Sequence, residues 1–366
     1  NTGLYRHYSY LARSFLSGRF DVPTLPLFYH DKTVIDGKTF IPFPPAPSFF
    51  LMPLAAIFGE NTNQIFFSMI IGALNVGLAW VLLETFGIRL KERAILTVFF
   101  GFGTVHWYAA ITGTTWFFAH IIAVFSLLLA IILLLKNKQP FLVGLFFGLA
   151  ALSRHPTLLS LPFFLFLLPK EKKSFLFFFL GATPLFSFQL FYNFSRFGDI
   201  FNEGYLDVYR SYIDSGFAYS FHRFFVLPVF PHFGYLDIRN IPLHLFTLFF
   251  MPPRILPEFP FLQPSPYGMS VILTSPIFLF SLRANFKEKL VKISWLATGL
   301  VSFLVFLHFS QGWVQFGYRF LLDFVPFLFI LTALGFGKIS KIKIFLVVIG
   351  VLANWWGVFW GRTLGW

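Results

Sequence analysis

Apolar blocks about as long as a bilayer is thick recur along this chain of 366 residues. The hydrocarbon core of a membrane is about 30 Å thick, which a helix of roughly 20 residues crosses. Ten blocks have this character, and their limits are 63–87, 94–112, 116–135, 140–153, 156–169, 174–194, 267–283, 291–309, 320–336 and 342–360. Hydrocarbon offers the backbone no hydrogen-bond partner, so the blocks are predicted to be helices. Strict apolar–polar alternation is absent, which disfavours a barrel.

The lysines collect in only some of the gaps between these blocks. Twelve of the 14 lysines form five short clusters, which are Lys91; Lys136 and Lys138; Lys170, Lys172 and Lys173; Lys287, Lys289 and Lys292; and Lys338, Lys341 and Lys343. Cytoplasmic loops of membrane proteins carry an excess of lysine and arginine. The clusters are therefore predicted to mark the cytoplasmic face, and the gaps rich in Arg, His, Asp, Tyr and Trp the outer face.

Residues 140–169 decide whether all the clusters can share one side. As a single helix they would run about 45 Å, which exceeds the hydrocarbon core and would separate two lysine clusters. Proline disrupts a helix interior, and Pro156 follows Arg154 closely in the middle of this stretch. Two short helices would return the chain to the same side. The small residues Gly144 and Gly148 could let the first of them pack closely on a neighbour.

Four regions follow from this topology. They are an outer-face segment at 1–62, helices at 63–194 with a break at 154–156, a long outer-face loop at 195–266, and C-terminal helices at 267–366. We expect a further span upstream of Asn1, because the chain starts without Met. Within the long loop, 241–253 is apolar but too short to span, so it is predicted to lie in the interface or to re-enter.

Composition agrees with an all-α, polytopic integral membrane protein of about ten helices. Charged residues make up 12% of the chain, against about 25% in soluble domains. The 58 phenylalanines and the mean hydropathy of +0.74 exceed what one soluble core can hold. Of the 28 lysines and arginines, 15 fit the lysine-rich gaps, so the net charge of +13 indicates membrane orientation rather than nucleic-acid binding.

Several kinds of chemistry are excluded. The chain has no cysteine, which excludes disulfides and thiolate metal sites. It also lacks a phosphate-binding Walker A loop, an HExxH motif, a dinucleotide fingerprint and a GxSxG elbow. An ATP-driven pump or a zinc protease of the usual kind is therefore disfavoured. No cofactor is predicted, and a divalent metal ion is left open.

Acidic residues of the first outer segment are candidates for a general base. Asp31 follows His30, and Asp21 and Asp36 qualify equally by location. A carboxylate beside an acceptor hydroxyl can take its proton when distance and pKa suit. An acid in a loop can equally be solvated without any such role, and both interpretations stay open.

Basic residues of the outer face are candidates for anion binding. Arg154 and His155 lie at the tip of the predicted helical hairpin, and an arginine deep in a bilayer costs about 2.5–3.5 kcal/mol. Arg154 would face a cavity or an anion, or snorkel to the outer headgroups. Arg319 and Asp323 are four residues apart, which on an α-helix allows an ion pair. Alternatively, Asp323 orients Arg319 toward a phosphate, which arginine binds in bidentate fashion.

Other polar residues have weaker claims. Three charged residues follow the end of a predicted span at the membrane surface, and they are Arg196, Asp199 and Glu203. They are either solvated or part of a site. His106 and His120 flank the turn at 112–116 together with tryptophans. Because no carboxylate accompanies them, an aromatic belt at the interface is preferred to a metal site.

Four segments resemble motifs of one enzyme family. They are FYHDKTVIDGKTFIPFPPAPSFFLMPLAAIFG (28–59), GLAALSRHPTLLSLPFFL (148–165), YNFSRFGDIFNEGY (192–205) and GWVQFGYRFLLDFVPFL (312–328). They are similar to, and occur in the same order as, motifs of bacterial integral-membrane glycosyltransferases of the C superfamily. The chain resembles uncharacterised members that are grouped with the protein mannosyltransferase and aminoarabinose transferase branch, and the likeness covers nearly the whole chain.

The resemblance implies a many-helix fold with its active site on the outer face and a polyprenyl-phosphate sugar donor. It also implies a catalytic carboxylate early in the first outer loop, but segment 1–15 contains no acid. The base would then lie upstream of Asn1, or be Asp31, or the chemistry is altered or lost. The local motifs match at Arg154, Arg196, Arg319 and Asp323, with Asp31 as the weak catalytic candidate. The resemblance implies that the three arginines bind the donor phosphate. Asp323, together with His155 and His30, would support the site.

The predicted function is therefore transfer of a sugar from a polyprenyl-phosphate donor to a lipid, glycan or protein acceptor. It would take place at the periplasmic face of a bacterial inner membrane, with the donor and membrane lipid as partners and no nucleic acid. A lipid or solute transporter is the alternative from another class, although only one broken hairpin and no inverted repeat is visible. A catalytically inactive scaffold is the third.

Overall fold

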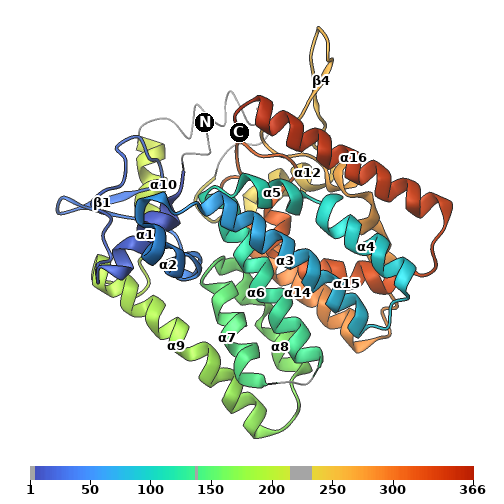
Figure 1. Cartoon of the computed structure of the whole chain (residues 1–366), viewed down its shortest axis with the longest axis horizontal. Helices are drawn as coiled ribbons and strands as arrows, with labels where there is room; N and C mark the ends of the chain where they lie inside the picture. The colour runs from blue at the N-terminus through green and yellow to red at the C-terminus, as the bar shows by residue number, and fades with distance from the viewer. Residues whose placement is uncertain (1–4, 137–138, 215–232) are drawn as a thin grey trace.

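The computed structural model describes residues 5–136, 139–214 and 233–366. The start of the first outer segment, Lys138 and the middle of the long loop 195–266 therefore lie outside the described residues. The described chain is built mainly of helices, with two short antiparallel hairpins of strands (Figure 1).

Within the described residues, five helices are long and apolar enough to cross a membrane, and they are α3 (Gln64–Thr85), α6 (Thr115–Leu135), α9 (Lys172–Phe197), α14 (Lys289–Phe306) and α16 (Lys341–Thr363). A sixth crossing would combine α4 (Leu90–Phe102) and α5 (Val105–Thr112), which are bent by 50°. The hydroxyl of Thr104 accepts a hydrogen bond from the backbone N–H of His106 at 3.2 Å and so caps α5 as a new helix. These helices are consistent with a membrane protein, as the hydropathy predicts.

The other expected spans are shorter or divided. They comprise α7 (Pro140–Ala151), η3 (His155–Ser160) with α8 (Leu161–Leu167), α13 (Val271–Thr274) with η5 (Pro276–Arg283), and α15 (Val325–Phe336). Block 267–283 is not one helix, because Pro276 disfavours a helical conformation of the preceding residue and Ser275 adopts φ −148°. Ten full-length crossings are thus not confirmed, since hydropathy counts apolar residues without registering such breaks.

The predicted break at Arg154 is confirmed. Helix α7 ends at Ala151, Arg154 is extended with φ −146° and ψ 102°, and η3 starts immediately before Pro156. The close approach expected at Gly144 is present as well. A Cβ at Gly144 would collide with the backbone oxygen of Phe178 in α9, so only glycine permits this packing.

The lysine-rich gaps gather at one end of the helices. Helix α6 begins beside Trp116 and ends just before Lys136, which places these residues at opposite ends of a 21-residue helix. The Nζ atom of Lys289, at the start of α14, donates to the backbone oxygen of Phe166 at 2.8 Å. The backbone N–H of Ile339 donates to Glu92 Oε1 at 3.3 Å. Both contacts join gaps that belong to lysine clusters.

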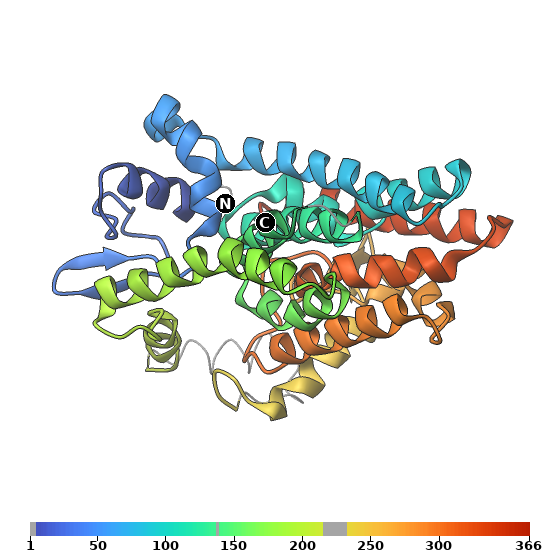
Figure 2. The same ribbon diagram turned by 90° about the horizontal axis from the view of Figure 1, so that it is seen from below.

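The opposite end is capped by the first outer segment and the chain after α9, as Figure 2 shows at its left. The cap contains α1 (His7–Leu16), β1 (Thr33–Ile35), β2 (Lys38–Phe40), α2 (Ala46–Phe58), η2 (Gly59–Asn61) and α10 (Tyr205–Asp214). Arg196 Nη1 donates to the oxygen of Ile41 at 2.8 Å, and Thr33 Oγ1 donates to the oxygen of Gly204 at 2.9 Å. These bonds fasten the two parts of the cap together.

The remaining elements belong to the chain between α10 and α15. They are η4 (Ile238–Asn240), α12 (Ile241–Phe249), β3 (Arg254–Ile255), β4 (Leu262–Gln263) and η6 (Arg319–Asp323). Helix α12 covers part of the apolar stretch 241–253 and has 9 residues. A helix of that length is too short to cross a membrane, as expected from the sequence.

Candidate anion site at the capped end

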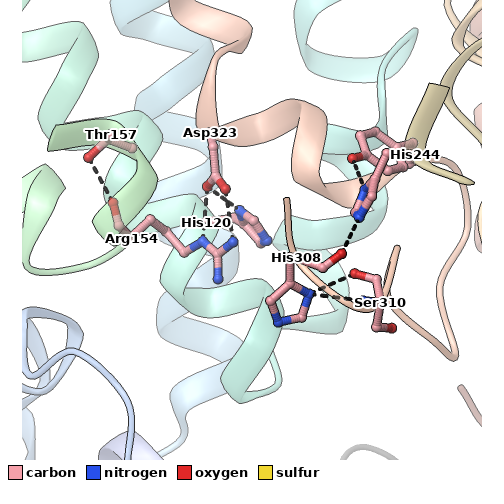
Figure 3. Close-up of polar contacts among 8 residues, drawn as sticks. His120, Arg154, Thr157, His244, His308, Ser310 and Asp323 are labelled. Atoms are coloured by element: carbon pink, nitrogen blue, oxygen red, sulfur yellow. Dashed lines mark hydrogen bonds and ion pairs between the residues drawn. The ribbon is translucent and has the colours of Figure 1, made fainter. Parts of the chain in front are cut away.

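A buried carboxylate lies near the start of α6, at the capped end of the helices. Asp323 is fully buried, and its Oδ1 accepts hydrogen bonds from Arg154 Nε at 2.9 Å and from His120 Nδ1 at 2.8 Å. Its Oδ2 accepts a second bond from Arg154, Nη2, at 2.8 Å. Figure 3 shows Arg154 and His120 converging on this one carboxylate. Bidentate pairing of this kind fixes the guanidinium plane as well as its charge.

This arrangement corrects the expected pairing of Arg319 with Asp323. Residues four apart share a face on an α-helix, but Arg319–Asp323 is the 3₁₀ helix η6. With three residues per turn, positions i and i+3 align and position i+4 points elsewhere. The carboxylate therefore meets Arg154, which stands 169 residues away in the sequence.

Arg319 itself is buried and forms no ion pair with a carboxylate in the part of the chain that the structure describes. Its side chain lies against the rings of Phe117 and Phe320, each 5.3 Å from the guanidinium carbon. Its Nη1 donates to the oxygen of Trp313 across 3.4 Å, and its Nε has no hydrogen-bond partner among the described residues. Burial and the neighbouring charge of Arg154 lower the pKa of Arg319 to about 10, so the group remains charged at neutral pH.

The two guanidiniums and the Asp323 carboxylate together carry one net positive charge, on which the charge of Asp31 acts from the edge of the group. Both arginines pack on the same ring, because Arg154 also lies 5.4 Å from the centre of Phe320. Arginine offers five donors and binds phosphate or carboxylate oxygens in bidentate fashion. The cluster of Arg154, Arg319, His120 and Asp323, here called the arginine cluster, is therefore suited to an anion.

Asp31 lies at the edge of the arginine cluster. Its Oδ2 accepts a hydrogen bond from Trp116 Nε1 at 2.7 Å, and its charge acts on both Arg319 and Tyr205. The backbone of Asp31 has φ +54°, an uncommon conformation for a residue other than glycine. His30 contributes its backbone oxygen, which accepts from His7 Nε2 at 2.8 Å, while its side chain is exposed.

His155 and Glu203 join the hairpin turn to the chain after α9. His155 Nδ1 lies 3.1 Å from Glu203 Oε2. Burial alone would raise the pKa of Glu203, but His155 and Arg196 together lower it. The pair fastens the turn that carries Arg154 to the loop that leads into α10.

Arg196 is occupied by oxygens of the protein. Its Nε, Nη1 and Nη2 donate to the backbone oxygens of Tyr192 and Ile41 and to Asn193 Oδ1, at 3.1, 2.8 and 2.9 Å. Its guanidinium also lies 3.6 Å from the ring centre of Tyr192. These contacts give Arg196 a structural position between α9 and the first outer segment, and none of them belongs to the arginine cluster.

His120 is the residue of the arginine cluster that the sequence analysis missed. The sequence places no acid near His120 and so favours an aromatic belt, yet its acidic partner Asp323 lies 203 residues away. The available signal was weak: a histidine early in a strongly apolar helix. His120 is fully buried, and its Nε2 has no partner among the described residues.

A second histidine positions the chain that leads into η6. His244 Nε2 donates to the oxygen of His308 at 2.8 Å, so the neutral ring accepts at Nδ1 from the hydroxyl of Tyr318 at 2.7 Å (Figure 3). Burial lowers the pKa of His244 to about 4 and keeps it neutral at physiological pH. Tyr318 directly precedes Arg319, so this network holds the first residue of η6.

An apolar cavity of about 350 Å³ lies next to η6. Its lining includes Phe249, Phe278, Trp295, Phe306, Leu321 and Phe324. Leu321 and Phe324 lie within or directly after η6, the element that carries Arg319 and Asp323. The arginine cluster and the cavity are thus neighbours along the same short segment.

Among the described residues, no three histidine, aspartate or glutamate side chains are grouped so that they could hold a metal ion. Comparisons with protein-family models, with curated proteins and with solved structures found no match. The chemistry of the arginine cluster and of its surroundings is therefore the basis for a function.

Proposed function

We propose that this chain is a membrane glycosyltransferase that uses a polyprenyl-phosphate sugar as donor. The observation that carries the proposal is the buried Arg319, which forms no ion pair with a carboxylate among the described residues. Arg319 lies in the same short helix as Leu321, which lines an apolar cavity. A donor of this class combines a phosphate with a long apolar chain. Arg319 suits the phosphate, and the cavity suits the first part of the chain.

The reaction would be a displacement at the anomeric carbon. The acceptor hydroxyl attacks that carbon, its proton passes to a carboxylate, and the bond from the carbon to the phosphate oxygen breaks. Polyprenyl phosphate leaves with the added negative charge. Arg319 would stabilise that charge, which is the usual role of preorganised cations in transfer reactions. Arg154 would contribute the part of its guanidinium that Asp323 does not occupy.

Asp31 is the proposed base. It lies at the edge of the arginine cluster, where its charge reaches Arg319 and Tyr205. Its hydrogen bond from Trp116 orients the carboxylate. His120 and Asp323 act by positioning Arg154. His155 fastens the turn that carries Arg154 through its pair with Glu203, and the backbone oxygen of His30 holds His7.

The membrane arrangement is part of the proposal. The ten apolar segments would all lie within the bilayer, five as long helices and the others as bent, divided or short helices. The lysine-rich end would face the cytoplasm, and the arginine cluster the periplasm of a bacterial inner membrane. A donor lipid could then enter from the side and meet its acceptor at the outer surface.

The decisive experiment separates donor binding from transfer. The purified full chain in lipid nanodiscs is given a fluorescent polyprenyl phosphate, and its displacement by unlabelled polyprenyl phosphate and by the uncharged polyprenol is measured. We expect the phosphate to compete at least tenfold better for the wild type and this preference to vanish in Arg319→Gln. The matched control is Arg210→Gln, because Arg210 is an exposed arginine on the same end.

Transfer is measured with a donor labelled in the sugar. Release of polyprenyl phosphate together with a labelled acceptor supports the glycosyltransferase. Movement of the intact donor between leaflets without bond cleavage would instead identify a flippase, for which the same arginine and cavity would serve. Binding without cleavage or movement would leave an inactive scaffold.

A further inference from the structure

The chain between α12 and α13 forms a hairpin that extends away from the helices. Strands β3 and β4 pair antiparallel, with Arg254 opposite Gln263 and Ile255 opposite Leu262. Figure 1 shows the hairpin projecting from the molecule beyond α16. Its tip, residues 256–261, is closed by two backbone hydrogen bonds of 2.8 Å, from Leu256 N to the oxygen of Phe261 and from Phe261 N to the oxygen of Glu258.

The hairpin exposes large apolar side chains. Ile255 is 84% exposed, Phe259 86%, Phe261 57% and Leu262 48%. Scattered single apolar residues are common on protein surfaces, but a contiguous group of this kind marks an interaction site. Phe261 also has φ +62°, a conformation that glycine adopts with far less strain than phenylalanine. A large ring is therefore placed at the tip despite the backbone conformation.

The register of the strands makes the hairpin amphipathic. Residues directly opposite each other in an antiparallel pair lie on the same face, and neighbours along a strand lie on opposite faces. Ile255 and Leu262 therefore share one face, and Arg254 and Gln263 share the other. One face is apolar, and the other carries a cation and an amide.

The apolar surface of the hairpin continues onto helices of the candidate membrane region. On one side the chain comes from α12, which ends at the exposed Phe249, and on the other it enters α13, where Leu273 is exposed. Helix α13 is fastened to the candidate span α16, because Asn354 Nδ2 donates to the oxygen of Thr274 at 2.8 Å. Next to Asn354, Trp355 projects from α16 and is exposed.

The position of Asn354 along α16 indicates the depth in the membrane of the chain that follows the hairpin. Helix α16 starts at Lys341, in a lysine cluster, and Asn354 lies in the half farther from that cluster. Tryptophans concentrate where a span meets the headgroups. Helix α13, into which the chain runs after the hairpin, is thus placed in the half of the bilayer that is opposite the lysine-rich end.

We propose that the β3–β4 hairpin is an interfacial anchor that lies in the outer leaflet of the membrane, with the lipid surface as its partner. The face of Ile255 and Leu262 and the rings of Phe259 and Phe261 enter the boundary between headgroups and acyl chains. Arg254 and Gln263 face the headgroups, where the guanidinium meets lipid phosphates. Amphipathic elements bind membranes in this way, through buried apolar area and attraction to anionic headgroups. The anchor depends on membrane insertion of the chain and not on sugar transfer.

The absence of cysteine makes the test direct, since one introduced thiol carries the only label. The Phe259→Cys variant of the full chain is labelled with the environment-sensitive fluorophore NBD and reconstituted in vesicles of phosphatidylethanolamine and phosphatidylglycerol. The matched control is Lys38→Cys, which places the label at an exposed position of the other hairpin, β1–β2. Fluorescence is quenched either by brominated lipids or by aqueous iodide.

We expect brominated lipid to quench the label at position 259 at least threefold more strongly than at position 38, with iodide showing the reverse order. Equal iodide quenching at both positions would place the hairpin in water and overturn the proposal. Quenching at position 259 by neither agent would mean that protein covers the tip, for example a second copy of the chain, and would overturn it as well. None of these outcomes depends on donor binding, so the result stands apart from the proposed function.

Discussion

Arg154 forms a bidentate ion pair with Asp323 across 169 residues of sequence, and this pair leaves Arg319 without the carboxylate that follows it four positions later. One arginine is thereby neutralised and fixed in orientation. The other is buried and forms no ion pair with a carboxylate among the described residues, although the charge of Asp31 reaches it from the edge of the cluster. Burial of a charge that has no ion-pair partner costs free energy. A bound anion would offset that cost at Arg319.

Removal of the buried carboxylate should destabilise the protein. In Asp323→Asn, Arg154 and His120 lose a charged acceptor in a buried position, and breaking such a pair from one side typically costs ~3 kcal/mol. The measurement is thermal unfolding in detergent or nanodiscs. The matched control is Asp237→Asn, whose carboxylate pairs with Arg239 at the surface at 2.8 Å. Equal unfolding temperatures for the two variants would contradict the central position of Asp323.

Two substitutions separate the hydrogen bond that His120 makes to Asp323 from the space that its ring fills. An asparagine can donate to Asp323 as His120 Nδ1 does, whereas a leucine leaves one carboxylate lone pair without its donor. We expect His120→Leu to lose ~1–2 kcal/mol of stability and His120→Asn to retain most of it. The order is read from unfolding midpoints of both variants. A leucine variant as stable as the asparagine variant would show that the hydrogen bond does not matter.

The packing of α7 on α9 should tolerate no side chain at Gly144. A Cβ there would strike the backbone oxygen of Phe178, which cannot rotate away. Overpacking of this kind costs ~1–3 kcal/mol, so Gly144→Ala should lower the unfolding midpoint. Gly77→Ala is the control, because a Cβ at Gly77 in α3 meets nothing within 4 Å. If both substitutions had the same small effect, the close contact would be absent in the protein.

Acidification should weaken the network around His244. Burial lowers the pKa of His244 to about 4, against about 6.5 in an unfolded chain. Between these values the unfolded state binds the proton and the folded state does not, so stability is intact above about pH 6.5 and falls as the pH drops toward 4. The contribution of this group reaches about 3 kcal/mol at most.

The variant His244→Gln isolates that contribution, because glutamine does not titrate. The unfolding free energies of wild type and variant are measured from pH 7.5 down to pH 4. We expect the wild type to lose stability more steeply than the variant over this interval. Parallel curves would mean that His244 is not held neutral by its surroundings.

Local features of the architecture were readable from the sequence, whereas the arginine cluster was not. Pro156 marks the break after Arg154, and the lysine clusters mark one end of the helices, because each of these signals acts within a few residues. The pairing of Asp323 with Arg154 and His120 joins segments that no periodicity connects. The four-residue spacing of Arg319 and Asp323 predicts an ion pair only on an α-helix. The chain forms the 3₁₀ helix η6 there, so the two side chains do not share a face.

The separation of expected spans into long and short helices has a similar cause. Hydropathy identified apolar blocks, and it could not indicate that Thr104 or Pro276 interrupts them. The side chain of Thr104 caps α5, and Pro276 begins η5. Such interruptions depend on single residues, which a long averaging window suppresses.

The most direct test of the account is the variant Arg319→Met, measured for both stability and ligand binding. A methionine fills similar space in the pocket between Phe117 and Phe320 and removes a buried charge that has no carboxylate partner among the described residues. We therefore predict an unfolding temperature equal to or higher than that of the wild type, together with loss of preference for polyprenyl phosphate over polyprenol. A variant that keeps this preference, or one that unfolds at a markedly lower temperature, would contradict the assignment of Arg319 as an anion-binding residue.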